Sequence, residues 1–198
     1  MDQGNQLFPV FFRLDQFEIL IIGGGYVALE KLTAIFLNSP NAIVTVVAID
    51  FIEEILNFAK IHSQIKLITK KYDSTDLESK SLVIAATTIR SLNIEVASTA
   101  KTKNILINVA DTPELCDFYL SSIVKKGDLK IAISTNGKSP TFAKRIRELL
   151  EEVIPDNIDA ILDNLKQIQK KLKGDFDFKV KRMNEITTII KNQNEENK

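Results

Sequence analysis

The sequence predicts an α/β protein, in which a parallel sheet covered by helices is followed by a small β-hairpin region and a helical C-terminal part. Three observations indicate this class: apolar runs alternate with helix-like stretches, an apolar run breaks into the triplet Gly23-Gly24-Gly25 before such a stretch, and amphipathic helical patterns dominate after residue 139. Alternation of this kind implies right-handed βαβ crossovers and a parallel sheet.

Five short β-rich runs have the continuous apolar character of strands buried on both faces of a sheet. They lie at 17–23, 42–49, 65–69, 81–87 and 104–109. Helix-like stretches separate them at 26–38, 51–62 and 89–103. We therefore expect a first domain over residues 1–112.

The rest of the chain predicts a hairpin and then helices. Residues 117–124 and 129–135 flank the turn signal KKGD and are expected to pair as antiparallel strands. A helix should follow, with Ser139 as N-cap and Pro140 at the first helical position, where its missing N–H costs nothing. Two more helices are expected at about 156–173 and 175–191, before a frayed tail. We therefore expect a hairpin region over residues 113–148 and a helical C-terminal domain over residues 149–198.

The composition is that of an ordinary soluble protein, with 44% hydrophobic and 26% charged residues and zero formal net charge. This balance argues against a nucleic-acid or membrane-surface binder. The N-terminus lacks the basic region and cleavage site of a signal peptide, and Cys116 is the single cysteine, so we expect a cytoplasmic location. Residues 121–191 carry 15 basic and 10 acidic side chains, which suits an anionic ligand or merely solvated helix faces.

The glycine turn lies in ILIIGGGYVALEK, residues 19–31, between an expected strand and an expected helix. Gly23, Gly25 and Ala28 match the G-x-G-x-x-A pattern of Rossmann-like nucleotide-binding units. In such units the first glycine makes the tight turn, the second lets the backbone approach a pyrophosphate, and the small third residue lets helix pack on strand. The alternative is a glycine turn that only packs.

The same pattern requires an acid near the end of the second strand to bind the ribose hydroxyls. Asp50 is the candidate, although it lies a little beyond the usual spacing, and an N-cap role before the next helix is the alternative. Since no arginine lies beside Asp50 to accept a 2′-phosphate, NAD is favoured over NADP.

Taken with the rest of the chain, this turn resembles the precorrin-2 dehydrogenase family, the dehydrogenase module of siroheme synthases that often doubles as a sirohydrochlorin ferrochelatase. Four stretches carry the resemblance: residues 7–31, IAAT (84–87), NVADTPELCDFYLSSIV (108–124) and IAISTNGKSPTFAKRIRELLEE (131–152). The resemblance implies NAD-dependent oxidation of precorrin-2, a tetrapyrrole, to sirohydrochlorin on the route to siroheme or cobalamin. It also implies a homodimer with residues 113–148 as the dimerisation region, and ferrous iron as a further substrate in members that chelate.

The resemblance places the family's key acid on Asp111 and a hydroxyl position on Thr135. Nucleotide-contacting positions fall on Tyr26, Val27, Ile49 and Asp50, and Thr87 at the end of IAAT is a further candidate for cofactor binding. The family's branch with a phosphorylated hydroxyl has serine where this chain has Thr135, so we expect no modification there.

The position of Asp111 agrees with this role independently of the family. It follows the fifth strand, at the carboxyl edge where open α/β sheets bind their ligands. Oxidation of the macrocycle means departure of a hydride and loss of a proton, and metal insertion removes two pyrrole protons, so one carboxylate base could serve both reactions. The alternative is that Asp111 caps the following turn, DTPE.

The turn TNGKSP offers groups for a polycarboxylate substrate. Gly137 permits unusual backbone angles, Lys138 brings charge, and the helix that opens at Ser139 presents free N–H groups. Lys144, Arg145 and Arg147 follow on different helix faces, where some only solvate the surface. Asn108 is expected to orient substrate or nucleotide, or else to satisfy backbone groups at its strand end.

No metal cage is expected, because His62, the only histidine, reads as a surface residue and Cys116 as a small packed hydrophobe without a partner. Two other functions stay open: a nucleotide sensor without catalysis and an oxidoreductase acting on another substrate. Asp111 together with the TNGKSP turn separates an enzyme from a sensor, since a sensor does not need a base beside the nicotinamide.

Overall fold

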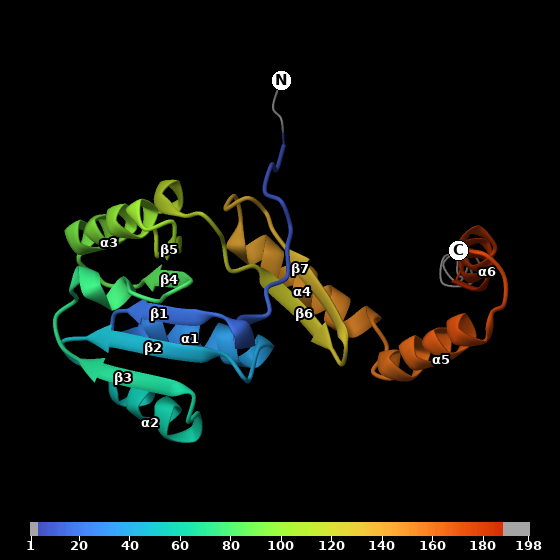
Figure 1. The fold of residues 1–198 in the computed structure, drawn as a ribbon, viewed down its shortest axis with the longest axis horizontal. Coiled ribbons are helices and arrows are strands. Elements are labelled where there is room, and N and C mark those ends of the chain that lie inside the picture. The colour runs from blue at the N-terminus through green and yellow to red at the C-terminus, as the bar shows by residue number, and fades with distance from the viewer. Residues whose placement is uncertain (1–3, 188–198) are drawn as a thin grey trace. The chain divides into compact units, whose positions relative to one another are not determined.

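The computed structural model describes residues 4–187 and divides into two compact units (Figure 1). The first unit extends to Ser121 and includes Asn136–Lys138, and the second holds Ser122–Thr135 and the chain from Ser139 onward. No helix within residues 4–187 combines the length and the apolar character that crossing a membrane requires.

A five-stranded parallel sheet forms the centre of the first unit, in the order β3-β2-β1-β4-β5. The strands are β1 (Glu18–Ile22), β2 (Ile43–Ala48), β3 (Ile65–Thr69), β4 (Leu82–Ala85) and β5 (Leu106–Val109). Every strand falls inside its predicted range and ends within two residues of the predicted bounds. The predicted α/β class with a Rossmann-like parallel sheet is therefore confirmed.

Three α-helices and one short 3-10 turn connect these strands, and two further 3-10 turns precede β1 and follow β5. The helices are α1 (Tyr26–Asn38), α2 (Glu53–Ile61) and α3 (Arg90–Thr102), and the turns are η1 (Leu14–Gln16), η2 (Ser74–Leu77) and η3 (Pro113–Leu115). The sequence predicted both ends of α1 correctly. It placed the start of α2 two residues too early and did not predict the 3-10 turns, whose few residues are too short to show a periodicity.

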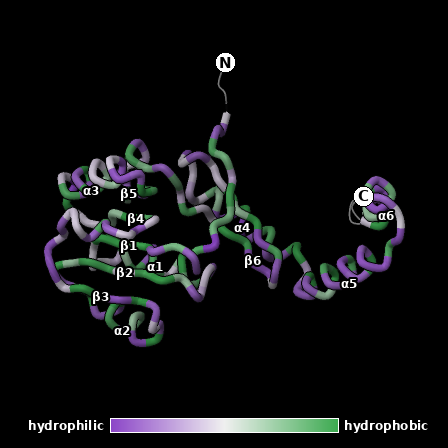
Figure 2. The backbone as a smooth tube through the Cα atoms, viewed as in Figure 1, coloured by the Kyte–Doolittle hydropathy of each residue, from purple (hydrophilic) through white to green (hydrophobic). Residues whose placement is uncertain are grey.

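Both faces of the sheet are buried. Ile19 and Ile21 of β1 pack with α1 and α2 on one face, whereas Leu20 and Ile22 pack with α3 on the other. Because consecutive side chains point to opposite faces and both faces are covered, the central strands β1, β2 and β4 have no polar alternation. They are drawn as largely hydrophobic segments in Figure 2.

The second unit begins with an antiparallel hairpin of β6 (Ser122–Lys126) and β7 (Leu129–Ile133), against which α4 (Pro140–Val153) packs. The first hairpin strand starts five residues later than predicted, because 117–121 is irregular. The Ser139 Oγ accepts a 3.1 Å hydrogen bond from the Phe142 N–H, which confirms Ser139 as N-cap and Pro140 at the first helical position.

Two further helices follow, α5 (Ile158–Lys171) and α6 (Phe176–Thr187). The Lys126 Nζ donates to the Ile154 carbonyl and pairs with Asp156 Oδ1, each at 2.6 Å, and it lowers the pKa of the Asp156 carboxyl. These bonds tie the segment between α4 and α5 to the hairpin turn. The predicted end of the last helix, 188–191, and the predicted frayed tail lie outside the described residues.

Candidate functional site

The glycine turn joins β1 to α1 at the carboxyl edge of the sheet. It lies where the strand order reverses between β1 and β4, the position at which open α/β sheets form their ligand crevice. Gly23 has φ +131°, and a Cβ there would overlap the carbonyl of Ala86 at the end of β4. A Cβ on Gly24 would overlap the carbonyl of Asp50 after β2. These two glycines therefore let the ends of both neighbouring strands approach the turn.

Gly25 differs from its two neighbours, because a Cβ there would meet nothing within 4 Å. It has φ −100° and ψ −169° and serves as N-cap of α1 without a side-chain hydrogen bond. The N–H groups of the first turn of a helix have no intrahelical partner and carry a partial positive charge. This open space in front of an uncapped helix start, called the phosphate cradle below, fits a pyrophosphate.

Sequence reasoning therefore selected Gly23 and Gly25 and missed the second glycine of the triplet. The motif allows any residue at the position of Gly24, so the motif alone gave no signal. Only the approach of the Asp50 carbonyl shows why a side chain is excluded there.

Asp50 lies two residues beyond β2, directly against the glycine turn. The Ile52 N–H donates to the Gly24 carbonyl at 2.9 Å, and Asp50 Oδ1 accepts from the Phe51 N–H at 2.8 Å. The N-cap of α2 is Ile52, so the N-cap alternative for Asp50 is wrong. The chain inserts Phe51 into the core before the helix begins, which leaves the Asp50 side chain exposed at the strand end.

Large apolar side chains stand exposed beside the cradle. Tyr26 is 68% exposed and Ile49 67% exposed, whereas Val27 packs against the core beneath α1. Exposed apolar surface next to a phosphate cradle suits a planar adenine ring. Contacts of Tyr26, Val27 and Ile49 with a nucleotide stay predictions.

Thr87 follows β4 and organises the loop to α3. Its hydroxyl donates to Asn93 Oδ1 at 2.7 Å, while Asn93 Nδ2 donates to the Thr87 carbonyl at 3.0 Å. Asn93 is only 5% exposed. Sequence reasoning missed Asn93, because one asparagine in an amphipathic helix does not reveal that it faces inward. A direct contact between Thr87 and the cofactor stays a prediction.

Asp111 lies at the same carboxyl edge, two residues after β5. The Ala110 N–H continues the ladder to the Ala85 carbonyl at 2.9 Å, and Asp111 then takes the left-handed conformation, with φ +56°. Its side chain is exposed, and within residues 4–187 its carboxylate has neither a hydrogen-bond nor an ion-pair partner. The N-cap of η3 is Thr112, without a side-chain cap. The capping alternative for Asp111 is therefore wrong.

The register of the sheet places this carboxylate relative to the cradle. Gly23, Ala86 and Ala110 follow the ends of three adjacent strands, β1, β4 and β5. Neighbouring strands lie about 4.8 Å apart, so roughly 10 Å of sheet edge separates β1 from β5. We therefore expect the nicotinamide half of a dinucleotide to lie between the phosphate cradle and Asp111.

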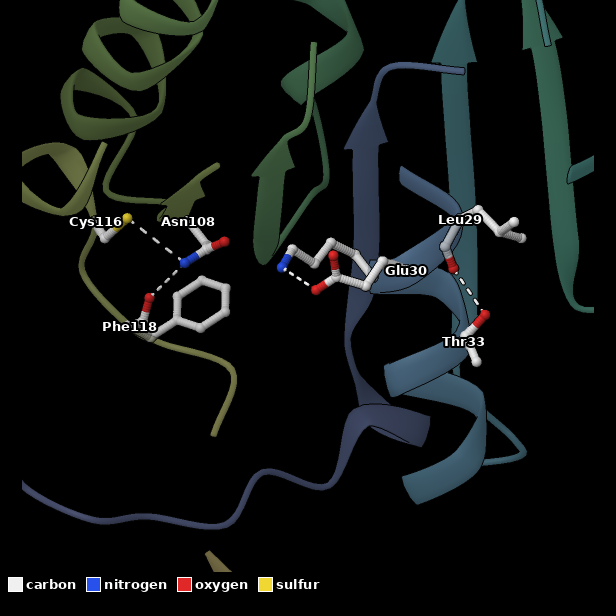
Figure 3. Close-up of polar contacts among 7 residues, drawn as sticks. Leu29, Glu30, Thr33, Asn108, Cys116 and Phe118 are labelled. Carbon is white, nitrogen blue, oxygen red and sulfur yellow. Dashed lines mark hydrogen bonds and ion pairs between the residues drawn. The ribbon is translucent and has the colours of Figure 1, made fainter. Parts of the chain in front are cut away.

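Asn108 is 7% exposed and serves the backbone (Figure 3). Its Nδ2 donates to the Phe118 carbonyl at 2.8 Å, which holds the segment after η3 against β5. This contact favours the alternative in which Asn108 satisfies backbone groups. Cys116 was expected to pack as a small hydrophobe, and it is a half-buried free cysteine whose Sγ accepts from the Val109 N–H at 3.1 Å. Burial raises the pKa of its thiol.

The turn at 135–139 has the backbone that its glycine predicted. Asn136 and Gly137 both take the left-handed conformation, with φ +53° and +74°. The Ser139 N–H donates to Thr135 Oγ1 at 3.2 Å and closes the turn. Because its residues are divided between the two units, the approach of this turn to Asp111 stays a prediction.

The basic residues of α4 form ion pairs along their own helix. They are Lys144 and Arg145 with Glu148, and Arg147 with Glu151. These pairs favour solvated helix faces over ligand contacts for this group.

His62 was expected on the surface, but it is half-buried. Its ring lies between Phe36 and Phe58, with centroid separations of 4.5 and 4.4 Å. The expectation was wrong because the end of α2 packs over the end of α1, a contact that helical periodicity does not encode. In the part of the chain that the structure describes, no three His, Cys, Asp or Glu side chains could hold a metal ion.

Comparison with known proteins gives a consistent result. A family model described as "Putative NAD(P)-binding" matches residues 10–122, and one described as "Sirohaem biosynthesis protein central" matches residues 126–152. The siroheme synthase of Psychrobacter cryohalolentis is 38% identical over 173 residues, covering 87% of this chain and 32% of the relative. That of Methylococcus capsulatus is 38% identical over 153 residues, covering 77% of this chain and 32% of the relative.

A solved structure of SirC, precorrin-2 dehydrogenase, has a TM-score of 0.69 and 25% identity, covering 91% of this chain and 89% of that one. The chain spans about a third of the length of the curated siroheme synthases it matches. The nucleotide-binding family model covers more than half of the chain, and the sequence and structural relatives agree with it. The chain belongs to the NAD(P)-binding precorrin-2 dehydrogenase and sirohydrochlorin ferrochelatase family.

Proposed function

We propose that this chain binds NAD at the glycine turn and oxidises precorrin-2 to sirohydrochlorin, with Asp111 as general base. The observation that carries the proposal is the Asp111 carboxylate, which is exposed and without a partner within residues 4–187, at the same sheet edge as the phosphate cradle. The names of the relatives, siroheme synthase and precorrin-2 dehydrogenase, supply the substrate class.

Three site residues of the first unit each have one task in the proposed reaction. The uncapped start of α1 at Gly25 binds the pyrophosphate, and Asp50 accepts hydrogen bonds from the ribose hydroxyls. The chemistry that NAD supplies when bound is acceptance of a hydride. Asp111 takes the proton that leaves the macrocycle, so the substrate loses a hydride and a proton, two electrons in all.

The remaining parts of the proposal concern the second unit. The substrate carboxylates would contact the turn formed by Thr135, Gly137, Lys138 and Ser139. The proposed domain boundaries lie after residues 112 and 148. A homodimer through the hairpin region is supported by β6 and β7, because both strands of this two-stranded sheet are edge strands, to which a second copy of the chain can add. Sedimentation velocity tests the dimer. A cytoplasmic location belongs to the same proposal.

The test is an anaerobic reaction of the purified chain with enzymatically prepared precorrin-2 and NAD, followed by NADH absorbance and the tetrapyrrole spectrum. Asp111→Asn is the decisive variant, because asparagine keeps the side-chain size and tolerates φ +56° but is no base. We expect turnover to fall by about 10²- to 10⁴-fold, with NAD affinity and melting temperature retained. Glu114→Gln, a nearby exposed acid, is the matched control and should keep wild-type turnover.

Normal turnover of Asp111→Asn would refute the base assignment. Binding of NAD without any NADH formation from precorrin-2 would instead favour the nucleotide sensor or an oxidoreductase acting on another substrate. Ferrous iron added at the end of the reaction tests the chelatase step, in which the sirohydrochlorin gives up two pyrrole protons. A protein-dependent rise in the rate of siroheme formation would support that activity.

A further inference from the structure

Tyr26 and Glu54 connect the start of α1 to the start of α2. The Tyr26 hydroxyl donates to Glu54 Oε1 at 3.3 Å, across 28 residues of sequence. Both side chains are exposed. The proposed reaction uses neither this hydrogen bond nor the Glu54 carboxylate.

This contact lies beside the proposed ribose site. The Ile52 N–H at the start of α2 is bonded to the Gly24 carbonyl, and the Asp50 carbonyl lies against the same glycine. Glu54 follows two residues after Ile52, in the first turn of α2. The Tyr26 hydroxyl thus holds the Glu54 carboxylate on the side of the cradle from which Asp50 would reach the ribose.

The start of α2 would otherwise attract a phosphate. Helix N-termini favour anions, and α2 has no side-chain hydrogen bond at its N-cap. A 2′-phosphate on the adenosine ribose would bring about two negative charges toward this helix end. Glu54 lies in the first turn of α2 and already brings a negative charge to this helix end.

We propose that Glu54, positioned by the Tyr26 hydroxyl, is a specificity-determining residue that disfavours NADP in addition to Asp50. The inference rests on the proposed function only in that a dinucleotide binds at the glycine turn. Glu53 provides an internal comparison: it is also exposed in the first turn of α2, but within residues 4–187 it has no hydrogen-bond or ion-pair partner. A free side chain of this kind can swing away from a phosphate.

The experiment compares Glu54→Gln with Glu53→Gln in the full chain by isothermal titration calorimetry, with NAD and NADP as separate ligands. Glu54→Gln should tighten NADP binding by about three- to tenfold, as expected for removing one like charge at a fully hydrated site, where water screens the repulsion. Its affinity for NAD should change less than about twofold, and raising the salt concentration should shrink the gain. Glu53→Gln should increase NADP affinity by less than half as much as Glu54→Gln.

Tyr26→Phe supplies a second reading, because it releases Glu54 while keeping the ring. It should shift the NADP to NAD ratio in the same direction, by less than Glu54→Gln. The inference is overturned if Glu54→Gln and Tyr26→Phe leave the ratio unchanged, if Glu53→Gln matches Glu54→Gln, or if the wild type binds both nucleotides equally. A wild type that binds neither nucleotide refutes the proposed function as well, whereas an NAD preference retained in both variants refutes only the role of Glu54.

Discussion

Replacing Gly25 with valine should separate nucleotide binding from folding. In the structure a Cβ at this position meets nothing within 4 Å, and φ −100° with ψ −169° is extended backbone that valine readily adopts. The valine side chain would project into the phosphate cradle. Gly24→Ala is the matched comparison, because its smaller addition would run into the Asp50 carbonyl.

We expect Gly25→Val to weaken NAD binding with little change in stability, and Gly24→Ala to lower the stability. For Gly25→Val, lower entropy of the unfolded chain stabilises by about 0.4–1 kcal/mol, and the poorer N-cap costs about 1 kcal/mol. The net change is thus within about 1 kcal/mol, or roughly 2–4 °C in melting temperature for a chain of this length. Losing two charge-assisted hydrogen bonds to the pyrophosphate costs roughly 3 kcal/mol, which weakens NAD about 100-fold. Gly24→Ala should lose about 2 kcal/mol of stability through overpacking, or roughly 4–8 °C.

Calorimetric titration with NAD and thermal unfolding of both variants provide the assay. The reasoning fails if Gly25→Val binds NAD with the wild-type dissociation constant, because the phosphates then do not lie at this glycine. It also fails if Gly25→Val melts as early as Gly24→Ala, because the space in front of Gly25 is then not open.

Three further predictions concern the first unit. Asn93→Ala removes the buried amide that holds Thr87 and should lower the free energy of unfolding by about 2 kcal/mol, roughly 4–8 °C in melting temperature; an unchanged melting temperature would contradict the role of this amide. His62→Ala removes a ring that contacts two phenylalanines and should lower the free energy of unfolding, measured in urea, by about 1 kcal/mol. An unchanged free energy of unfolding would show that these ring contacts do not stabilise the fold. Cys116 should react slowly with a thiol reagent at pH 8 in the native protein and quickly in urea, because burial raises the pKa of its thiol. A thiol pKa above its unfolded value means that the folded state holds the proton more tightly, so this contribution to stability is present below the unfolded pKa and is lost as the pH rises through the folded pKa. Equal labelling rates in the native and the urea-unfolded protein would contradict the burial of this thiol.

Much of the fold could be predicted because its signals are local. The glycine turn marks the start of α1, and the predicted range 26–38 matches that helix at both ends. The strands followed from apolar runs, since a strand covered on both faces has no polar side. The cap at Ser139 followed from the residue types that satisfy a helix start. Each of these features depends on residues within a few positions of one another.

The site was predictable only where a residue's role depends on its place in an element. Asp111 could be chosen because it follows a strand, and Gly25 because it precedes a helix. The sequence could not exclude the capping alternatives for Asp50 and Asp111, since an Asp before a helix or turn fits both roles. The structure decided against both by placing the caps at Ile52 and Thr112.

By itself the sequence determined the order of the α-helices and strands, the bounds of the five parallel strands to within two residues, the glycine turn and the family resemblance. Only the tertiary structure decided that Gly24 must lack a side chain, that Asn93 faces inward, that His62 lies between two rings, and that Tyr26 reaches Glu54. The physical reason is the same in each case: these contacts join segments from different elements. Their existence depends on how strands and helices pack, which the periodicity of one segment does not specify.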